Sequence, residues 1–349
     1  MYKIEIFDET LAFRSAAAID DSNEIEEDYL ADQAYSIAVQ MIPAQKGWIV
    51  HITDDGRTVA DGLICDVQQD TLYTVSLSIK PLTSLLDCQV FVDGPIADVD
   101  AWLAQQIEAC YITNPDVLQR RPLAIDVLQD HPARPLQVPG DKSTVKLSDI
   151  ARRALLTYSV VCHWRLDLRE RLIRLNITRV ETSQKLEADL DNVIARSVVL
   201  GSSYGSTNKL LLRKIRTNQD TGTKAVLGQN AYYLHADGSV DQTNANRITP
   251  VFWTLDELEE CDTWDADARQ KAEEALCPEQ YDQCIELSYR INDTLLEPLS
   301  IPIGTNTQIA MAGNVYRSIL TGRRMADNVA TLIFGAVRVE ITKRLKEMK

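Results

Sequence analysis

Cys162 and His163 are the neighbouring residues with the most reactive side chains, a thiol beside an imidazole. A thiol acts as a nucleophile when a base lies within hydrogen-bonding reach of it. The segment from Val160 to Leu168 alternates between apolar and polar residues, which is typical of a strand. Because adjacent strand residues point to opposite faces, we expect these two side chains to share no proton and to form no nucleophilic site.

The histidines offer no metal-binding pattern, since the chain has four of them and none is spaced as His-x-x-x-His. His51 falls in an amphipathic strand pattern and His235 stands beside a turn. We interpret both as ordinary strand-end or surface histidines, with a role in a site as the alternative.

Acidic residues gather in two stretches. The first, which consists of Glu24, Glu26, Glu27 and Asp28, could hold a cation, but it lacks the Asp-x-Asp-x-Asp-Gly order of a calcium loop. We expect a loop or an exposed edge over 24–32. The second consists of Asp256, Glu257, Glu259, Glu260, Asp262, Asp265 and Asp267. We expect it to be the start of a helix, where carboxylates favour the positive end of the dipole, and a solvated face.

Two further patterns could bind anions. Residues 201–206, Gly-Ser-Ser-Tyr-Gly-Ser, resemble a phosphate loop but lack the Gly-Lys-Ser/Thr ending and a following helix. Five arginines fall on an expected hairpin with interleaved acids, where cross-strand ion pairs or a solvated face are the usual outcome and a protein–protein contact is the alternative. These arginines are Arg165, Arg169, Arg171, Arg174 and Arg179.

The seven cysteines do not form a Cys-x-x-Cys pair, so the close spacing that zinc requires is absent. They are Cys65, Cys88, Cys110, Cys162, Cys261, Cys277 and Cys284. We expect reduced, mostly buried thiols in a chain made in a reducing cytoplasm. The sequence therefore predicts no enzyme, no catalytic residue, no dedicated metal site and no cofactor.

The charge is unevenly distributed along the 349 residues. The whole chain has a net charge of −15, and residues 1–110, with 20 acids and 5 bases, account for all of it. Nucleic-acid-binding proteins display basic surfaces that release counterions from phosphates. We therefore expect no stable binding to DNA, and a solubilising excess of charge is an equally simple interpretation. Charges interrupt every apolar run, so we also expect no membrane insertion.

The elements that must position these residues are mostly strands. Period-2 patterns fill residues 1–93, and strand patterns return after about Leu186. Between them we expect two helices, near 98–110 and 148–158, one strand at 123–128, and a hairpin of 160–168 with 172–180. The predicted fold is strand-dominated α+β, with two β-barrel-like domains separated by a smaller α+β module. The predicted domains are 1–93, 94–185 and 186–349, the last with one helix near 265–276 and strands that include 337–342.

The last third of the chain carries a family resemblance. Its segments Tyr316-Arg317-Ser318-Ile319-Leu320-Thr321-Gly322 and Phe334-Gly335-Ala336-Val337-Arg338-Val339-Glu340-Ile341-Thr342-Lys343 resemble those of baseplate or tail-tip hub proteins from phages and prophages of Gram-positive bacteria. The stretch Val161 to Val180 is similar to the mid-chain hairpin of that family. The resemblance covers about half of the chain, and its motifs are structural ones.

The resemblance implies a virion protein of the tail tip, made in the bacterial cytoplasm. Such hubs are homotrimers that link the tail tube to the tip, surround the DNA channel and contact the distal tail protein, the tape-measure protein and a downstream tip or fibre protein. We expect any cell-wall lytic activity on another polypeptide. The alternatives are a glycan- or receptor-binding tail module, which requires exposed aromatic residues along a groove, and a hydrolase with an unrecognised site.

Overall fold

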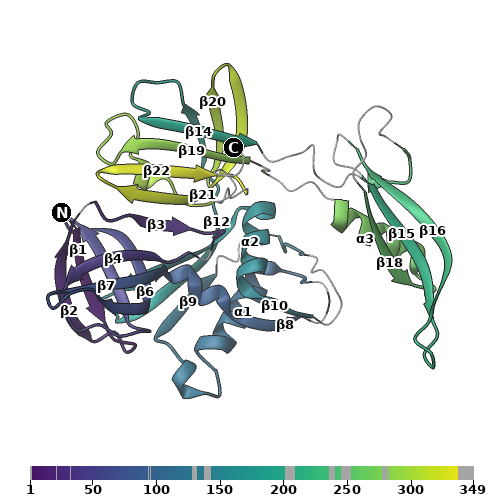
Figure 1. Ribbon diagram of the computed structural model, residues 1–349, viewed down its shortest axis with the longest axis horizontal. Coiled ribbons are helices and arrows are strands. Elements are labelled where there is room, and N and C mark those ends of the chain that lie inside the picture. Colours follow the sequence, from purple (N-terminus) through teal and green to yellow (C-terminus); the bar gives the residue numbers. More distant parts are fainter. Residues whose placement is uncertain are drawn as a thin grey trace. The chain divides into compact units, whose positions relative to one another are not determined.

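The computed structural model describes most of the chain. The described residues are 2–20, 22–31, 33–92, 94, 96–127, 132–136, 143–200, 209–235, 240–244, 253–276, 281 and 283–336. Within them the protein is strand-dominated α+β, as its sequence predicts (Figure 1). Contacts along the chain separate two compact units, residues 1–199 with 283–349 and residues 200–282. The domain boundaries at 93/94 and 185/186 remain predictions.

The amino-terminal strands form a six-stranded antiparallel sheet that curves into a half-barrel, in the order β2-β1-β5-β6-β7-β4. Its strands are β1 (Tyr2–Phe7), β2 (Phe13–Ile19), β4 (Tyr35–Gln40), β5 (Ile49–Asp54), β6 (Arg57–Gln69) and β7 (Thr74–Pro81). Alternate residues such as Ile4, Ile37 and Leu77 are fully buried on the inner face. The period-2 pattern of the sequence therefore becomes one apolar core.

A four-residue strand, β3 (Ile25–Asp28), leaves the half-barrel and pairs with β21 of a second sheet. That second sheet has the order β13-β20-β21-β22-β19-β14. Its strands are β13 (Ser183–Glu187), β14 (Ala195–Leu200), β19 (Gln283–Arg290), β20 (Asn306–Met311), β21 (Asn314–Ala326) and β22 (Val329–Phe334), with the 3₁₀ turn η3 (Pro298–Ser300). The prediction of a loop is thus wrong for residues 25–28. Among the described strands β3 pairs with β21 alone, so it is an edge strand, but its residues are buried or partly buried instead of exposed.

The intervening part of the chain contains two helices against small sheets. Its elements are η1 (Leu82–Asp87), β8 (Gln89–Val92), α1 (Val99–Tyr111), η2 (Val117–Gln119), β9 (Leu123–Val127), β10 (Ser143–Lys146), α2 (Leu147–Tyr158), β11 (Val160–Asp167) and β12 (Leu172–Arg179). The predicted hairpin is confirmed, since β11 and β12 pair antiparallel and β9 joins β12 in parallel. Helix α2 begins at Leu147, one residue before the predicted start at Ser148, and its N-cap position is Lys146.

Residues 200–282 form a separate unit of one four-stranded sheet and one helix. The sheet order is β17-β16-β15-β18, from β15 (Lys209–Thr217), β16 (Lys224–Leu234), β17 (Val240–Asp241) and β18 (Trp253–Glu259). Helix α3 (Trp264–Leu276) packs Trp264 and Ala268 against Leu210 and Leu212. None of the helices in the described ranges is long and apolar enough to cross a membrane. The expected strand at 337–342 and the loop at 201–206 lie outside the described residues.

Candidate functional site

Two cavities of about 160 Å³ each lie in the larger unit and meet at Tyr29, directly after β3. Both are lined by Tyr29, Pro81 and Thr83. Tyr29 occupies this position because its amide N–H donates to the carbonyl oxygen of Thr321, 2.9 Å away on β21. Its hydroxyl oxygen accepts the amide N–H of Cys162 on β11, also at 2.9 Å. Burial raises the pKa of Tyr29 well above its usual value, so the phenol stays neutral.

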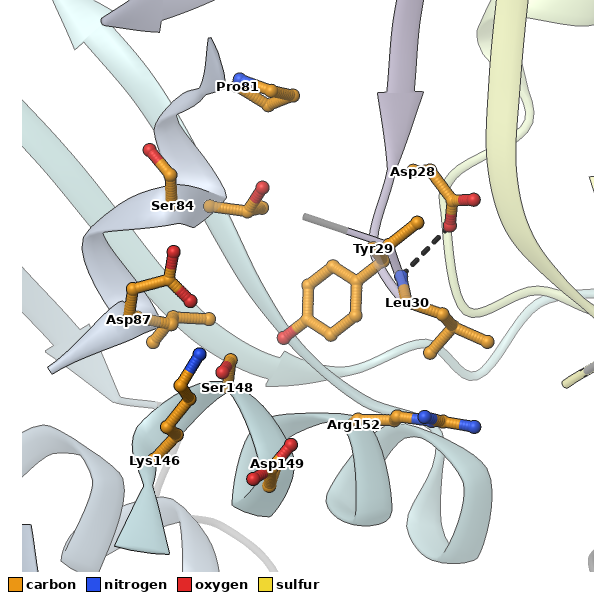
Figure 2. A pocket seen from close by; sticks show the side chains of 13 residues that line it. Asp28, Tyr29, Leu30, Pro81, Ser84, Asp87, Lys146, Ser148, Asp149 and Arg152 are labelled. Carbon is orange, nitrogen blue, oxygen red and sulfur yellow. Dashed lines mark hydrogen bonds between the residues drawn. The ribbon is translucent and has the colours of Figure 1, made fainter. Parts of the chain in front are cut away.

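The first cavity has a wall of mixed charge (Figure 2). Lys146 and Arg152 line it from the start and first turns of α2, and Asp28, Asp87 and Asp149 also line it. One oxygen of Asp28 accepts the amide N–H of Leu30 at 2.9 Å, as Figure 2 shows. Three carboxylates and two basic groups are thus interleaved on its wall.

The second cavity contains polar atoms without protein partners. The hydroxyl of Tyr35 and the indole nitrogen of Trp164 are buried and make no hydrogen bond within the described chain. Burial raises the pKa of Tyr35, and the nearby carboxylates of Asp61 and Glu27 raise it further. The local sequence does not predict that Tyr35 and Trp164 line the same cavity, because the two residues belong to separate sheets.

Cys162 and His163 line this second cavity. Burial raises the pKa of the Cys162 thiol to about 12, so the reactive thiolate is scarce at neutral pH. Burial lowers the pKa of His163, and no hydrogen bond joins the two side chains in the part of the chain that the structure describes. Both residues line one cavity even though they are neighbours on a strand, and the expectation that they form no nucleophilic site stays a prediction.

His51 is the histidine whose burial the sequence analysis predicted wrongly. We predicted a surface or strand-end residue, yet His51 is 8% exposed, and its Nδ1 lies 2.6 Å from Oδ1 of Asp61. The prediction is wrong because His51 lies on the central strand β5 and Asp61 lies opposite it on β6. Nε2 of His235 forms a comparable contact with Asp241 at 2.8 Å, in the smaller unit.

The first acidic stretch binds arginines across the strand pair β3–β21. Arg323 lies 3.2 Å from Glu27, and Arg324 lies 3.0 Å from Glu24 and 3.6 Å from Glu26. Burial raises the pKa of Glu26, and Arg324 opposes that effect. Over the described ranges, no group of three or more His, Cys, Asp or Glu side chains could hold a metal ion.

The second acidic stretch is divided between β18 and α3. Asp265 and Asp267 lie in the first turn of the helix, as expected. Residues 256–259 lie on the strand, however, which corrects the expectation of a helix start there. Two of their carboxylates form ion pairs with lysines: Lys271 lies 2.8 Å from Asp256, and Lys224 lies 2.7 Å from Glu257.

Two of the five arginines on the predicted hairpin, Arg174 and Arg179, form ion pairs among the described residues, and one partner, Asp126, belongs to β9. Arg174 contacts Asp126 at 3.4 Å, Asp167 at 3.1 Å and also Glu170. Arg179 lies 3.9 Å from Glu181. This is the cross-strand pairing that the interleaved acids favour.

Comparison with known proteins identifies the fold of the chain but no family and no relative by sequence. No family model matches the chain, and no curated protein matches its sequence. Solved structures match over nearly the whole length. The P2 virion baseplate in its activated conformation contains a chain with a TM-score of 0.58 at 12% identity, over 97% of this chain and 100% of that one. A 43 kDa tail protein of prophage MuSo2 from Shewanella oneidensis has a TM-score of 0.53 at 15% identity, over 96% and 98%. A tail protein from Neisseria meningitidis MC58 has a TM-score of 0.52 at 13% identity, over 96% of each chain. The fold is therefore that of phage tail and baseplate proteins.

Proposed function

We propose that this chain is a structural subunit of a phage or prophage tail tip, the baseplate hub that links the tail tube to the tip. The observation that carries the proposal is the similarity of fold to a baseplate chain and to two tail proteins from end to end. A fold hosts many functions, so the site must be considered as well. The cavities at Tyr29 contain buried, neutral or ion-paired groups, which suits a structural protein better than an enzyme.

The proposal includes assembly and position. The hub is a homotrimer in the virion, surrounds the DNA channel, and contacts the distal tail protein, the tape-measure protein and a tip or fibre protein. The acidic excess of residues 1–110 would repel the duplex within the Debye length of about 8 Å at physiological salt. A host with a Gram-positive cell wall, which the resemblance implies, remains a prediction.

Purified particles test the proposal. The chain should be present in virions at three copies per tail by quantitative mass spectrometry, and antibody labelling should mark the tip. Particles made without its gene should lack normal tail tips, and the wild-type gene should restore them. Absence of the chain from tailed particles would refute the proposal.

A glycan-binding module has less support. Trp264 is buried, Trp48, Trp102 and Trp164 are partly buried, and Trp253 is 56% exposed. Tryptophans of the described chain therefore do not line an exposed groove together.

Duplex DNA provides a second check on the charge argument. The pure protein should not bind duplex DNA at moderate ionic strength, whereas salt-dependent binding would contradict an acidic channel wall.

A further inference from the structure

A third cavity, of about 600 Å³, lies between the turn after β4 and the loop after α1 and is the largest of the three described here. Two apolar side chains on its wall face solvent, since Val117 is 68% exposed and Leu118 is 84% exposed. Trp48 lines the cavity beside them. Exposed apolar side chains that gather at a concave surface mark an interaction site more often than a free surface.

The wall of this cavity carries more basic than acidic side chains. Lys46, Arg120 and Arg121 line it, against one acid, Glu9. Neither Lys46 nor Arg121 forms an ion pair within the described residues. Lys46 is one of only five bases among residues 1–110, and Arg120 and Arg121 follow that acidic stretch. An occupant should therefore bring both apolar surface and negative charge.

Both walls are held by hydrogen bonds from backbone amides. The side-chain oxygen Oδ1 of Asp116 accepts the amide N–H of Leu118 at 3.0 Å, and the amide of Arg121 donates to the carbonyl oxygen of Tyr111 at 2.9 Å. On the other wall, Gly47 adopts a φ of 89° and its N–H donates to the carbonyl oxygen of Ile64 at 2.8 Å. A preformed cavity of this kind loses little conformational entropy when it is filled.

A matching protrusion occurs on the same chain, at the turn between β6 and β7. Leu72 and Tyr73 are each 78% exposed, and Met41 beside them is 47% exposed. The turn is ordered, because the amide of Met41 donates to the carbonyl oxygen of Tyr73 at 2.8 Å and Thr71 caps the turn. Asp70 and Asp66 precede it, and residues 58–79 contain no base. The protrusion thus has apolar side chains that can pack on the apolar wall of the cavity, and acidic charge that complements its basic residues.

We propose that Leu72 and Tyr73 of one copy dock into the basic cavity lined by Trp48, Val117 and Leu118 of the next copy. This inference rests on the proposed ring of hub subunits and names the surfaces that would close it. Chains with a charge of −15 repel one another at long range, so copies need a local contact of opposite charge. Two different surfaces on one chain make a heterologous contact, which closes into a ring when the rotation allows.

The test uses two variants that each lose one surface. The protrusion variant, Leu72→Ser with Tyr73→Ser, retains the cavity, and the cavity variant, Leu118→Glu with Arg121→Glu, retains the protrusion. Sedimentation velocity from ~5 to ~500 µM covers the range in which small contacts are populated. We expect the wild-type chain to associate into trimers and each variant alone to associate at least about tenfold more weakly, as loss of a central contact does.

An equimolar mixture of the two variants gives the decisive result. The intact protrusion of the cavity variant should enter the intact cavity of the protrusion variant, and association should stop at a heterodimer. Lys185→Glu with Leu295→Ser, at exposed positions outside both surfaces, should associate as the wild type does. A wild type that stays monomeric throughout, variants that assemble normally, or a mixture that stays monomeric while the wild type associates would each overturn the inference. The content of tail tips is measured separately, so these outcomes leave the proposed function standing.

Discussion

His51 on β5 and Asp61 on β6 form a buried contact that reaches a third strand. Their side chains are 11% and 7% exposed, and Nδ1 of His51 lies 2.6 Å from Oδ1 of Asp61. The other carboxylate oxygen, Oδ2, accepts the amide N–H of Leu166 on β11 at 2.8 Å. One carboxylate therefore ties the half-barrel sheet to the β11–β12 hairpin. Because both oxygens have partners, this pair serves the structure and leaves no free base.

Removal of the Asp61 carboxylate should destabilise the larger unit. Asp61→Ala leaves His51 and the Leu166 amide without their acceptor in a buried place, and we expect a loss of about 2 to 4 kcal/mol in the free energy of unfolding. Asp61→Asn should cost less because its amide oxygen can still accept one hydrogen bond. Urea unfolding measures both, with the exposed Asp66→Ala as the control. Equal effects of Asp61→Ala and Asp66→Ala would contradict the link.

Asp8 should make stability depend on pH. Burial opposes its ionisation, but hydrogen bonds from Thr10, Ala12 and Arg14 outweigh burial and hold the pKa of Asp8 at about 2. A carboxylate with a lowered pKa stabilises the folded state above its ordinary pKa of 3.8, and this contribution is lost as the pH falls toward 2.

Asp8→Asn should therefore lower the free energy of unfolding at neutral pH by about 1.5 to 3 kcal/mol, the contribution of a hydrogen bond to a charged group. The difference from wild type should shrink as the pH falls from about 4 toward about 2, the interval between the unfolded and folded pKa values. Urea midpoints across this range provide the measurement. A difference independent of pH would show that the ionised carboxylate is not the stabilising species.

Gly335 should be intolerant of any side chain. It adopts a φ of 94°, and a Cβ at this position would lie 1.9 Å from the carbonyl oxygen of Gln283. Gly313 adopts a φ of 78°, but a Cβ there would have no heavy atom within 4 Å. Gly313→Ala should thus cost about 1 kcal/mol for the left-handed backbone alone. Gly335→Ala should cost clearly more, because the backbone of β19 must also move. Equal melting temperatures for the two variants would contradict the close approach.

Cysteine labelling should separate the buried Cys162 from the exposed Cys261. Cys162 is buried and the pKa of its thiol is raised to about 12, whereas Cys261 is exposed. Because the thiolate is the reactive form, iodoacetamide at neutral pH should modify Cys261 long before Cys162 in the folded protein. Peptide mass spectrometry with time measures this order, and denaturant should abolish it. Early modification of Cys162 in the folded protein would contradict the conclusion that its thiol is unreactive at neutral pH.

Much of the local structure follows from the sequence because its signals are short-range. The alternation from Val160 to Val180 predicts the β11–β12 hairpin within a residue or two, and the alanine-rich pattern after Asp265 predicts a helix where α3 occurs. Such periodicities reflect which face of one element is buried, and neighbouring residues alone encode them.

The contacts at the site depend on residues far apart in the chain. Glu26 and Glu27 meet Arg324 and Arg323, almost 300 residues later, so the local sequence around β3 shows only an acidic run. His51 became a buried, paired residue through its register with Asp61. Composition and periodicity thus determined the fold class and most strands, whereas strand order and register decided which charges are neutralised and where cavities open. The reason is physical: burial patterns are local, but partners are chosen by packing between sheets.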